Sequence, residues 1–190
     1  MNGALGWRAR MALQRRIFRL HARIHGLRRG VTSAAGAQVG RRCRIIVEPG
    51  AHLVLGPGVE IDDGTTISLS RNATVELGSG CFVGHHCTIA ARERVTIGSG
   101  TFLAELVSIR DHDHDPDAPP SGGGALCAPV SIGRDVWLAA KVTVTRGVEI
   151  GDRTVVAANA VVTRSLPGDV VAGGVPARML RDKSPPREQQ

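Results

Sequence analysis

The residues best suited to chemistry stand together in the segment RDHDHDPD, which begins at Arg110. His112 and His114 alternate there with aspartates, and an imidazole titrates close enough to neutral pH to act as a general base. A hydroxyl group is a poor nucleophile until such a base removes its proton. Asp111 is suited either to orienting the base or to fixing the turn of the loop. The segment therefore predicts a general-base site with two candidate histidines.

This segment interrupts a repeat that must position it. Aliphatic anchors recur every six residues, and they fall into groups of three: Leu55, Ile61, Ile67; Leu77, Val83, Ile89; Ile97, Leu103, Ile109; Ile132, Leu138, Val144; Ile150, Val156, Val162. A period of six suits neither an amphipathic helix nor a long alternating strand. It suits a solenoid with three flat sides, in which each hexad supplies one short strand and one turn. Extra residues follow every third anchor, so we expect the insertions at one corner of the triangle.

Composition agrees with a turn-rich solenoid of small residues. The 190 residues suffice for one domain, and they include 24 glycines but only 3% aromatics. The net charge of +7 suits an anionic partner, but no nucleic-acid module is present and no nucleic-acid binding is expected. The four cysteines form no CxxC pair, which favours small buried side chains over a zinc or redox site. Without an apolar leader segment, the sequence predicts a cytoplasmic protein.

Residues 36–181 resemble the hexapeptide-repeat family, whose members form left-handed parallel β-helices. From Pro129 onward, PVSIG, Trp137, RGVEIGD, VVTRSLP and GGVPARMLR are similar to the end of the galactoside, maltose and polysaccharide O-acetyltransferase branch. The resemblance implies an all-β solenoid that transfers an acetyl group from acetyl-CoA to a sugar hydroxyl without a metal. It also implies a homotrimer with active sites between neighbouring chains, acting on a glycan acceptor in surface polysaccharide or glycolipid biosynthesis.

The resemblance assigns a base and its surroundings. Family members place the base at the sixth position of the third hexad, and in the hexad that starts at Ile109 this position is His114, which is favoured over His112. The backbone N–H of Ala140 corresponds to the donor for the thioester oxyanion. Trp137 corresponds either to a ring beside the base and the pantetheine arm, or to a filler of the core or the trimer interface.

The resemblance also marks a binding path for CoA. Its expected residues are Ala139 and Ala158 through backbone groups, Asn159 at a departure from the usual Gly-Ala-Gly, and Arg164, Arg178 and Arg181 toward the phosphates. For each arginine, a solvated surface charge is the competing interpretation. His85 is expected at the acceptor site or at an interface, because its corner lies next to the His114 loop.

The expected organisation is a basic amphipathic helix in residues 1–30, a β-helix domain over 31–181 with an active-site loop at 110–131, and a disordered tail at 182–190. The helix over residues 5–28 is suited either to an anionic membrane face, which would make the protein peripheral at the inner membrane, or to packing across the trimer.

Other interpretations of the sequence stay open. They are a xenobiotic or antibiotic O-acetyltransferase of the same superfamily and a non-catalytic β-helix scaffold. A zinc site at His85 and His86, as in the γ-class carbonic anhydrases, would need three ligands, and the paired downstream histidines of that class are missing. The sequence identifies neither the acceptor nor the hydroxyl that is modified.

Overall fold

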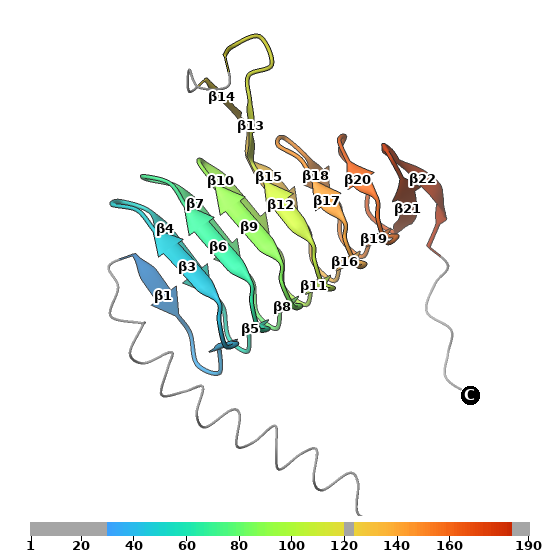
Figure 1. Ribbon diagram of the computed structural model, residues 1–190. Helices are drawn as coiled ribbons and strands as arrows, with labels where there is room; N and C mark the ends of the chain where they lie inside the picture. The colour runs from blue at the N-terminus through green and yellow to red at the C-terminus, as the bar shows by residue number, and fades with distance from the viewer. Residues whose placement is uncertain (1–29, 120–123, 184–190) are drawn as a thin grey trace, which may run out of the picture.

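The computed structural model describes residues 30–119 and 124–183, and every regular element in these ranges is a β-strand. The strands stack as successive rungs of a parallel β-helix (Figure 1). This confirms the expected all-β solenoid. The helix expected over residues 5–28 lies outside the described residues, as does the tail from residue 184 onward. No helix in the described ranges is long and apolar enough to cross a bilayer.

Three parallel sheets form the sides of the solenoid. The first sheet contains β1 (Val31–Ser33), β4 (His52–Leu55), β7 (Thr74–Leu77), β10 (Arg94–Ile97), β15 (Val130–Ile132) and β18 (Glu149–Ile150). The second contains β2 (Gln38–Val39), β5 (Glu60–Ile61), β8 (Phe82–Val83), β11 (Phe102–Leu103), β16 (Trp137–Leu138), β19 (Val155–Val156), β21 (Val170–Gly174) and β22 (Ala177–Asp182). The third contains β3 (Arg44–Val47), β6 (Thr66–Leu69), β9 (Thr88–Ala91), β12 (Ser108–Arg110), β17 (Thr143–Val144) and β20 (Val161–Val162).

The six-residue anchors form the core, because each anchor pairs in register with the anchor one coil away. In the second sheet Val83 pairs with Leu103 and Leu103 with Leu138, and all three are fully buried. Each sheet repeats this inward stacking, so apolar burial runs along the whole axis. The extra residues after every third anchor lie at the corner between the third and first sheets, as the spacing predicts.

Small polar side chains fasten the other corners to the next coil. The hydroxyl of Thr65 donates to Gly84 O at 2.9 Å and accepts from the N–H of Cys87 at 3.2 Å. Cys87 stands in the same row one coil later, and its thiol donates to Ala104 O at 3.1 Å. Burial raises the pKa of the Cys87 thiol to about 11. The buried cysteines therefore act as neutral packing and hydrogen-bonding groups, as the sequence predicts.

The segment after β12 forms a hairpin that projects from the solenoid (Figure 1). Strands β13 (His112–His114) and β14 (Ala125–Cys127) pair antiparallel, with His112 opposite Cys127. The sequence predicts only a long loop here. Backbone pairing instead orders both ends of the segment, so the two histidines occupy defined strand positions.

The last strand reverses direction. Strand β22 pairs antiparallel with β21, the final parallel strand of the second sheet. The N–H of Lys183 then donates to Asp169 O at 2.7 Å, so the ordered backbone continues to the end of the described range.

Candidate active site

A buried carboxylate organises the corner from which the hairpin projects. Asp111 stands next to Ala91 in the third sheet, in the inward row that also contains Val47 and Leu69. It is 0% exposed, and a buried carboxylate needs hydrogen-bond donors around it. Three consecutive backbone N–H groups of the preceding coil supply them. Asp111 is therefore a core residue whose carboxylate accepts hydrogen bonds from the backbone.

The donors belong to the turn between β9 and β10. The N–H of Arg92 donates to Asp111 Oδ1 at 2.8 Å, and those of Glu93 and Arg94 donate to Oδ2 at 2.7 and 2.8 Å. A three-donor cradle of this kind satisfies a carboxylate that water cannot reach. Asp111 thus fixes a turn of the neighbouring coil, whereas the sequence suggests that it fixes the turn of its own loop.

The Asp111 carboxylate also contacts one of the two histidines. His112 Nδ1 lies 2.9 Å from Asp111 Oδ1, and the His112 side chain is 22% exposed. When Nδ1–H donates to the carboxylate, Nε2 keeps its lone pair and can accept a proton. His114 is on the same hairpin strand, but its ring is exposed and has no hydrogen-bonding partner in the described part of the chain. Only His112, of the two histidines, touches the orienting carboxylate.

A pocket of about 110 Å³ adjoins both imidazoles. It is lined by Arg92, Arg110, His112, Asp113, His114 and Ala125. The carboxylate of Asp113 lies 3.3 Å from Arg146 Nε, an ion-pair distance, although the N–H of this buried Nε makes no well-directed hydrogen bond. Sequence reasoning did not single out Arg92 or Arg110. Arg92 reaches the pocket through the stacking of one coil on the next, which residue spacing in a single hexad does not reveal.

The residues expected to handle the thioester lie on another corner. Ala139–Ala140 and Ala157–Ala158 both join the second sheet to the third, on successive coils. Within the described ranges the N–H groups of Ala140 and Ala158 have no acceptor, whereas the N–H of Asn159 donates to Ala140 O at 2.9 Å. Small side chains leave these two donors accessible, about 4.8 Å apart by the strand spacing.

The backbone conformation of the turn explains why an asparagine is tolerated at position 159. It has a positive φ of 60°, and Lys141 in the same row has 62°. Asn is among the few side chains that tolerate this conformation. The departure from the family's usual glycine therefore preserves the turn.

Trp137 stands on the outside of the second sheet and is 49% exposed, so its role as a core filler is excluded. Its register partner is Phe102, which in turn pairs with Phe82. The two phenyl rings are stacked with centroids 4.6 Å apart. An exposed aromatic row of this kind is uncommon on a free surface. Trp137 also lies two residues before Ala139, on the strand that leads to the Ala140 donor.

The three arginines expected to bind CoA phosphates lie near the end of the solenoid and are exposed. Arg164 follows β20, while Arg178 and Arg181 belong to β22. Their guanidinium groups form no ion pair with any carboxylate of the described residues. Arg178 and Arg181 donate only to backbone carbonyls of Ala177 and Asp182. Their guanidinium groups can therefore bind an anionic ligand. The same positions are equally consistent with solvated surface charges.

His85 lies in the same corner row as Ala140, with one coil between them. Its Nε2 is 3.5 Å from Asp62 Oδ2, and burial raises the pKa of this carboxyl above its ordinary value, although the nearby His85 opposes the shift. The neighbouring His86 packs its ring over Gly64, where a Cβ would collide with the imidazole. No group of three potential metal ligands occurs among the described residues.

One chain does not bring the base and the thioester donors together. His112 follows the third sheet, at its corner with the first, whereas Ala140 and His85 precede the third sheet. A four-residue strand such as β9 (Thr88–Ala91) separates these corners by roughly 13 Å.

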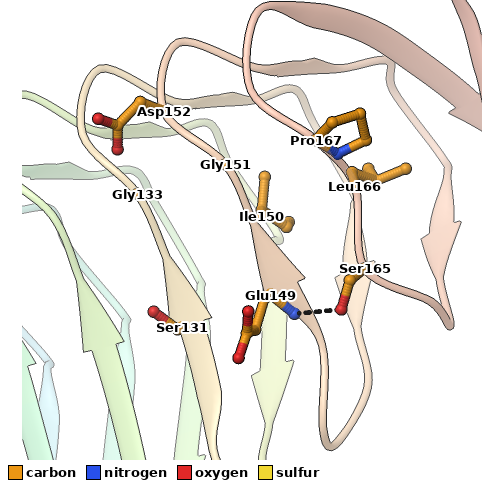
Figure 2. Close-up of a pocket in the computed structure, with 9 residues that line it drawn as sticks. All are labelled: Ser131, Gly133, Glu149, Ile150, Gly151, Asp152, Ser165, Leu166 and Pro167. Atoms are coloured by element: carbon orange, nitrogen blue, oxygen red, sulfur yellow. Dashed lines mark hydrogen bonds between the residues drawn. The ribbon is translucent and has the colours of Figure 1, made fainter.

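A second hollow carries no comparable chemistry. It has a volume of about 440 Å³ and lies on the first sheet, where Figure 2 shows its lining, including Glu149, Asp152 and Ser165. Ser165 Oγ accepts the N–H of Glu149 at 3.0 Å, and Asp152 is held by Arg134 at 2.8 Å. Its lining contains no imidazole.

Comparison with known proteins identifies the fold and the reaction class. Residues 129–164 match the bacterial transferase hexapeptide family (six repeats). The chain is 33% identical over 162 residues to the putative lipopolysaccharide biosynthesis O-acetyl transferase WbbJ of Escherichia coli K12, and the match covers 74% of this chain and 80% of that protein. The chain belongs to the hexapeptide-repeat transferase family. It is an acetyltransferase of this family.

Two further similarities agree with this assignment. The chain is 31% identical over 117 residues to the galactoside O-acetyltransferase of Escherichia coli K12, covering 61% of this chain and 58% of that protein. The fold matches the hexapeptide-repeat acetyltransferase VCA0836 of Vibrio cholerae O1 biovar eltor, solved with acetyl-CoA, with a TM-score of 0.56 and 24% identity over 97% of this chain and 81% of that one.

Proposed function

We propose that this acetyltransferase transfers the acetyl group of acetyl-CoA to a sugar hydroxyl, in surface polysaccharide or glycolipid biosynthesis. The observation that carries the proposal is the 2.9 Å contact between His112 Nδ1 and the buried Asp111 carboxylate, which prepares Nε2 to take a hydroxyl proton. The names of the relatives, a lipopolysaccharide and a galactoside O-acetyltransferase, support the sugar acceptor. The cytoplasm, where acetyl-CoA is made, is the proposed location.

The two candidate histidines differ in their surroundings. Hexad counting favours His114, but strand β12 ends at Arg110, Asp111 is the last residue of the inward row, and the hairpin begins with His112. We assign the base to His112 because a carboxylate orients it. His114 then lines the pocket on the acceptor side.

The reaction follows from these positions. His112 Nε2 accepts the proton of the acceptor hydroxyl, while Asp111 holds Nδ1–H and stabilises the imidazolium. Acetyl-CoA supplies a thioester whose carbonyl carbon bonds to the hydroxyl oxygen and whose C–S bond then breaks. The N–H of Ala140 donates to the carbonyl oxygen as negative charge develops there. His112 finally returns its proton to the departing CoA sulfur, which leaves the base neutral for the next turnover.

The proposed assembly is a homotrimer, which the resemblance to the family implies. Because His112 and Ala140 lie on different corners of one chain, we propose that the corner containing His85, Ala140 and Ala158 faces His112 of a neighbouring copy. A left-handed coil, as in the family, and the exposed row of Phe82, Phe102 and Trp137 beside that corner are consistent with this packing. The expected helix over residues 5–28 would then contact either the trimer or an anionic membrane face.

Acceptor profiling tests the proposal. Acetyl-CoA turnover is measured with sugars, oligosaccharides and antibiotics for the native protein, His112→Ala and His114→Ala. We expect His112→Ala to lose roughly 10²- to 10⁴-fold in kcat, as removal of a general base does, while His114→Ala keeps most of it. Loss confined to His114→Ala would return the base to that residue. Equal activity of all three proteins would exclude acetyl transfer at this corner, and turnover only with antibiotics would assign the xenobiotic function.

A further inference from the structure

Some arginines of this solenoid pair with carboxylates, while others, among them two beside His112, have no such partner within the described residues. Arg94 pairs with Glu76, Arg134 with Asp152, and Arg153 with Asp169. Arg92 and Arg110, both exposed, form no ion pair with a carboxylate of residues 30–119 and 124–183. They are also the two arginines that line the pocket containing His112.

The negative charges near this pocket are already engaged. Asp113 lies against Arg146, and Asp111 is enclosed by three backbone N–H groups and His112. Glu93 stands in the same turn as Arg92 but does not line the pocket. The pocket therefore presents an excess of positive charge next to the proposed base.

The same carboxylate places these arginines relative to the base. The backbone N–H of Arg92 donates to Asp111 at 2.8 Å. Arg110 is the last residue of β12 and directly precedes Asp111. His112 is held by Asp111 at 2.9 Å. The backbone that carries both guanidinium groups is thus fixed around Asp111, the same residue that holds the imidazole of His112.

The two arginines of the lining favour a ligand that carries an oxyanion, such as a carboxylate or a phosphate group. Guanidinium groups bind either oxyanion through paired N–H donors.

We propose that Arg92 and Arg110 bind an oxyanion of the acceptor, so that this enzyme acetylates an acidic sugar: a uronic acid, or a sugar that carries a phosphate. This inference rests on the proposed function and narrows its substrate class. The bound oxyanion anchors the acceptor, and a hydroxyl on the same sugar meets Nε2 of His112.

Matched acceptor pairs test the inference. The ratio of kcat/KM is measured for methyl galacturonide against methyl galactoside, and for glucose 1-phosphate against methyl glucoside, with native protein, Arg92→Gln and Arg110→Gln. Arg94→Gln is the control, because Arg94 sits in the same turn and its guanidinium is paired with Glu76. We expect native enzyme to prefer at least one acidic acceptor by about 10- to 100-fold, and each pocket variant to lose most of that preference while Arg94→Gln keeps it.

Each outcome separates this inference from the function on which it rests. Equal kcat/KM for the acidic and neutral members of both pairs, or an equal loss of preference in Arg92→Gln and Arg94→Gln, would overturn the oxyanion site and leave acetyl transfer intact. Calorimetric binding of the acidic glycosides is the second readout. Binding that Arg92→Gln and Arg110→Gln weaken, in a protein that transfers acetyl to no acceptor, would retain the site and reject the function. The pair that shows the preference identifies the oxyanion as carboxylate or phosphate.

Discussion

The imidazole of His112 and the carboxylate of Asp111 are joined by a 2.9 Å contact between adjacent residues, one in the pocket and the other in the core. Adjacent residues on a strand normally point to opposite sides. The contact forms here because strand β12 ends at Arg110 and the chain turns at Asp111 into the hairpin. The imidazole of His112 is thereby held against a residue of the buried core.

The first prediction concerns the contact between Asp111 and His112. Asp111→Asn keeps the size of the side chain but turns an NH₂ group toward backbone donors and removes the charge that stabilises the imidazolium. We expect kcat to fall by roughly 10²-fold or more, and the free energy of unfolding to fall by about 1–3 kcal/mol. Acetyl-transfer kinetics and urea unfolding measure the two effects. Asp113→Asn, on the exposed hairpin, is the control for unfolding, and native kcat in Asp111→Asn would refute the orienting role.

A second prediction removes the proposed oxyanion donor without disturbing the turn. The fold already uses proline at this place in a turn, because Pro57 precedes the positive-φ Gly58 as Ala140 precedes the positive-φ Lys141. Ala140→Pro should therefore fold, yet it lacks the N–H and should lose about 10²- to 10³-fold in kcat. Ala140→Gly retains the N–H and serves as the matched control. Unchanged kcat in a folded Ala140→Pro protein would mean that another group holds the oxyanion.

The third prediction tests whether the two corners meet between copies. His112→Ala and Ala140→Pro subunits, each nearly inactive alone, are mixed, dissociated and reassembled. A site that takes its base from one copy and its donor from the next regains function in mixed trimers, at about a quarter of native activity for equal amounts. Sedimentation gives the assembly state and turnover gives the activity. Mixed assemblies that stay inactive would place both groups of a site within one chain.

The fourth prediction separates strain from collision at glycine turns. Gly58 and Gly64 both have a positive φ, but a Cβ at Gly58 meets nothing within 4 Å, while one at Gly64 meets the His86 ring. Gly58→Ala should cost about 1–2 kcal/mol of unfolding free energy from backbone strain alone, and Gly64→Ala should cost more. Urea denaturation compares them. Equal losses would indicate that the His86 ring moves aside freely.

The fifth prediction uses the raised pKa of Cys87. The folded thiol has a pKa of about 11 against 9.0 for the exposed group, so the folded state holds the proton more tightly. The contribution to stability is complete below pH 9 and is lost as the pH rises toward 11. Cys87→Thr should remove this alkaline loss. Its hydroxyl should still donate to the next coil, as the hydroxyl of Thr65 does one coil earlier. Unfolding at pH 8 and pH 10.5 measures it, and an identical drop in both proteins would trace the alkaline loss to other groups.

The sequence predicts the solenoid because its evidence is local and periodic. Each hexad carries its own aliphatic anchor and turn, and the registers of Val83, Leu103 and Leu138 follow from counting. It does not predict that Asp111 meets the turn at Arg92, since this contact joins residues 19 apart through the stacking of two coils. The choice between His112 and His114 depends on where the third sheet ends, and no periodicity encodes that boundary.

The hairpin of β21 and β22 has a consequence for how the molecule ends. A parallel solenoid offers the unpaired edges of its last rung to any similar edge, which is a route to end-to-end fibres. Strand β22 covers the edge of β21 with a strand of opposite direction, so another solenoid finds no parallel rung to extend in that sheet. At the same end, the backbone of Leu166 pairs with β18, and β20 is only two residues long. The reversal therefore closes this end of the second sheet to extension by a parallel strand.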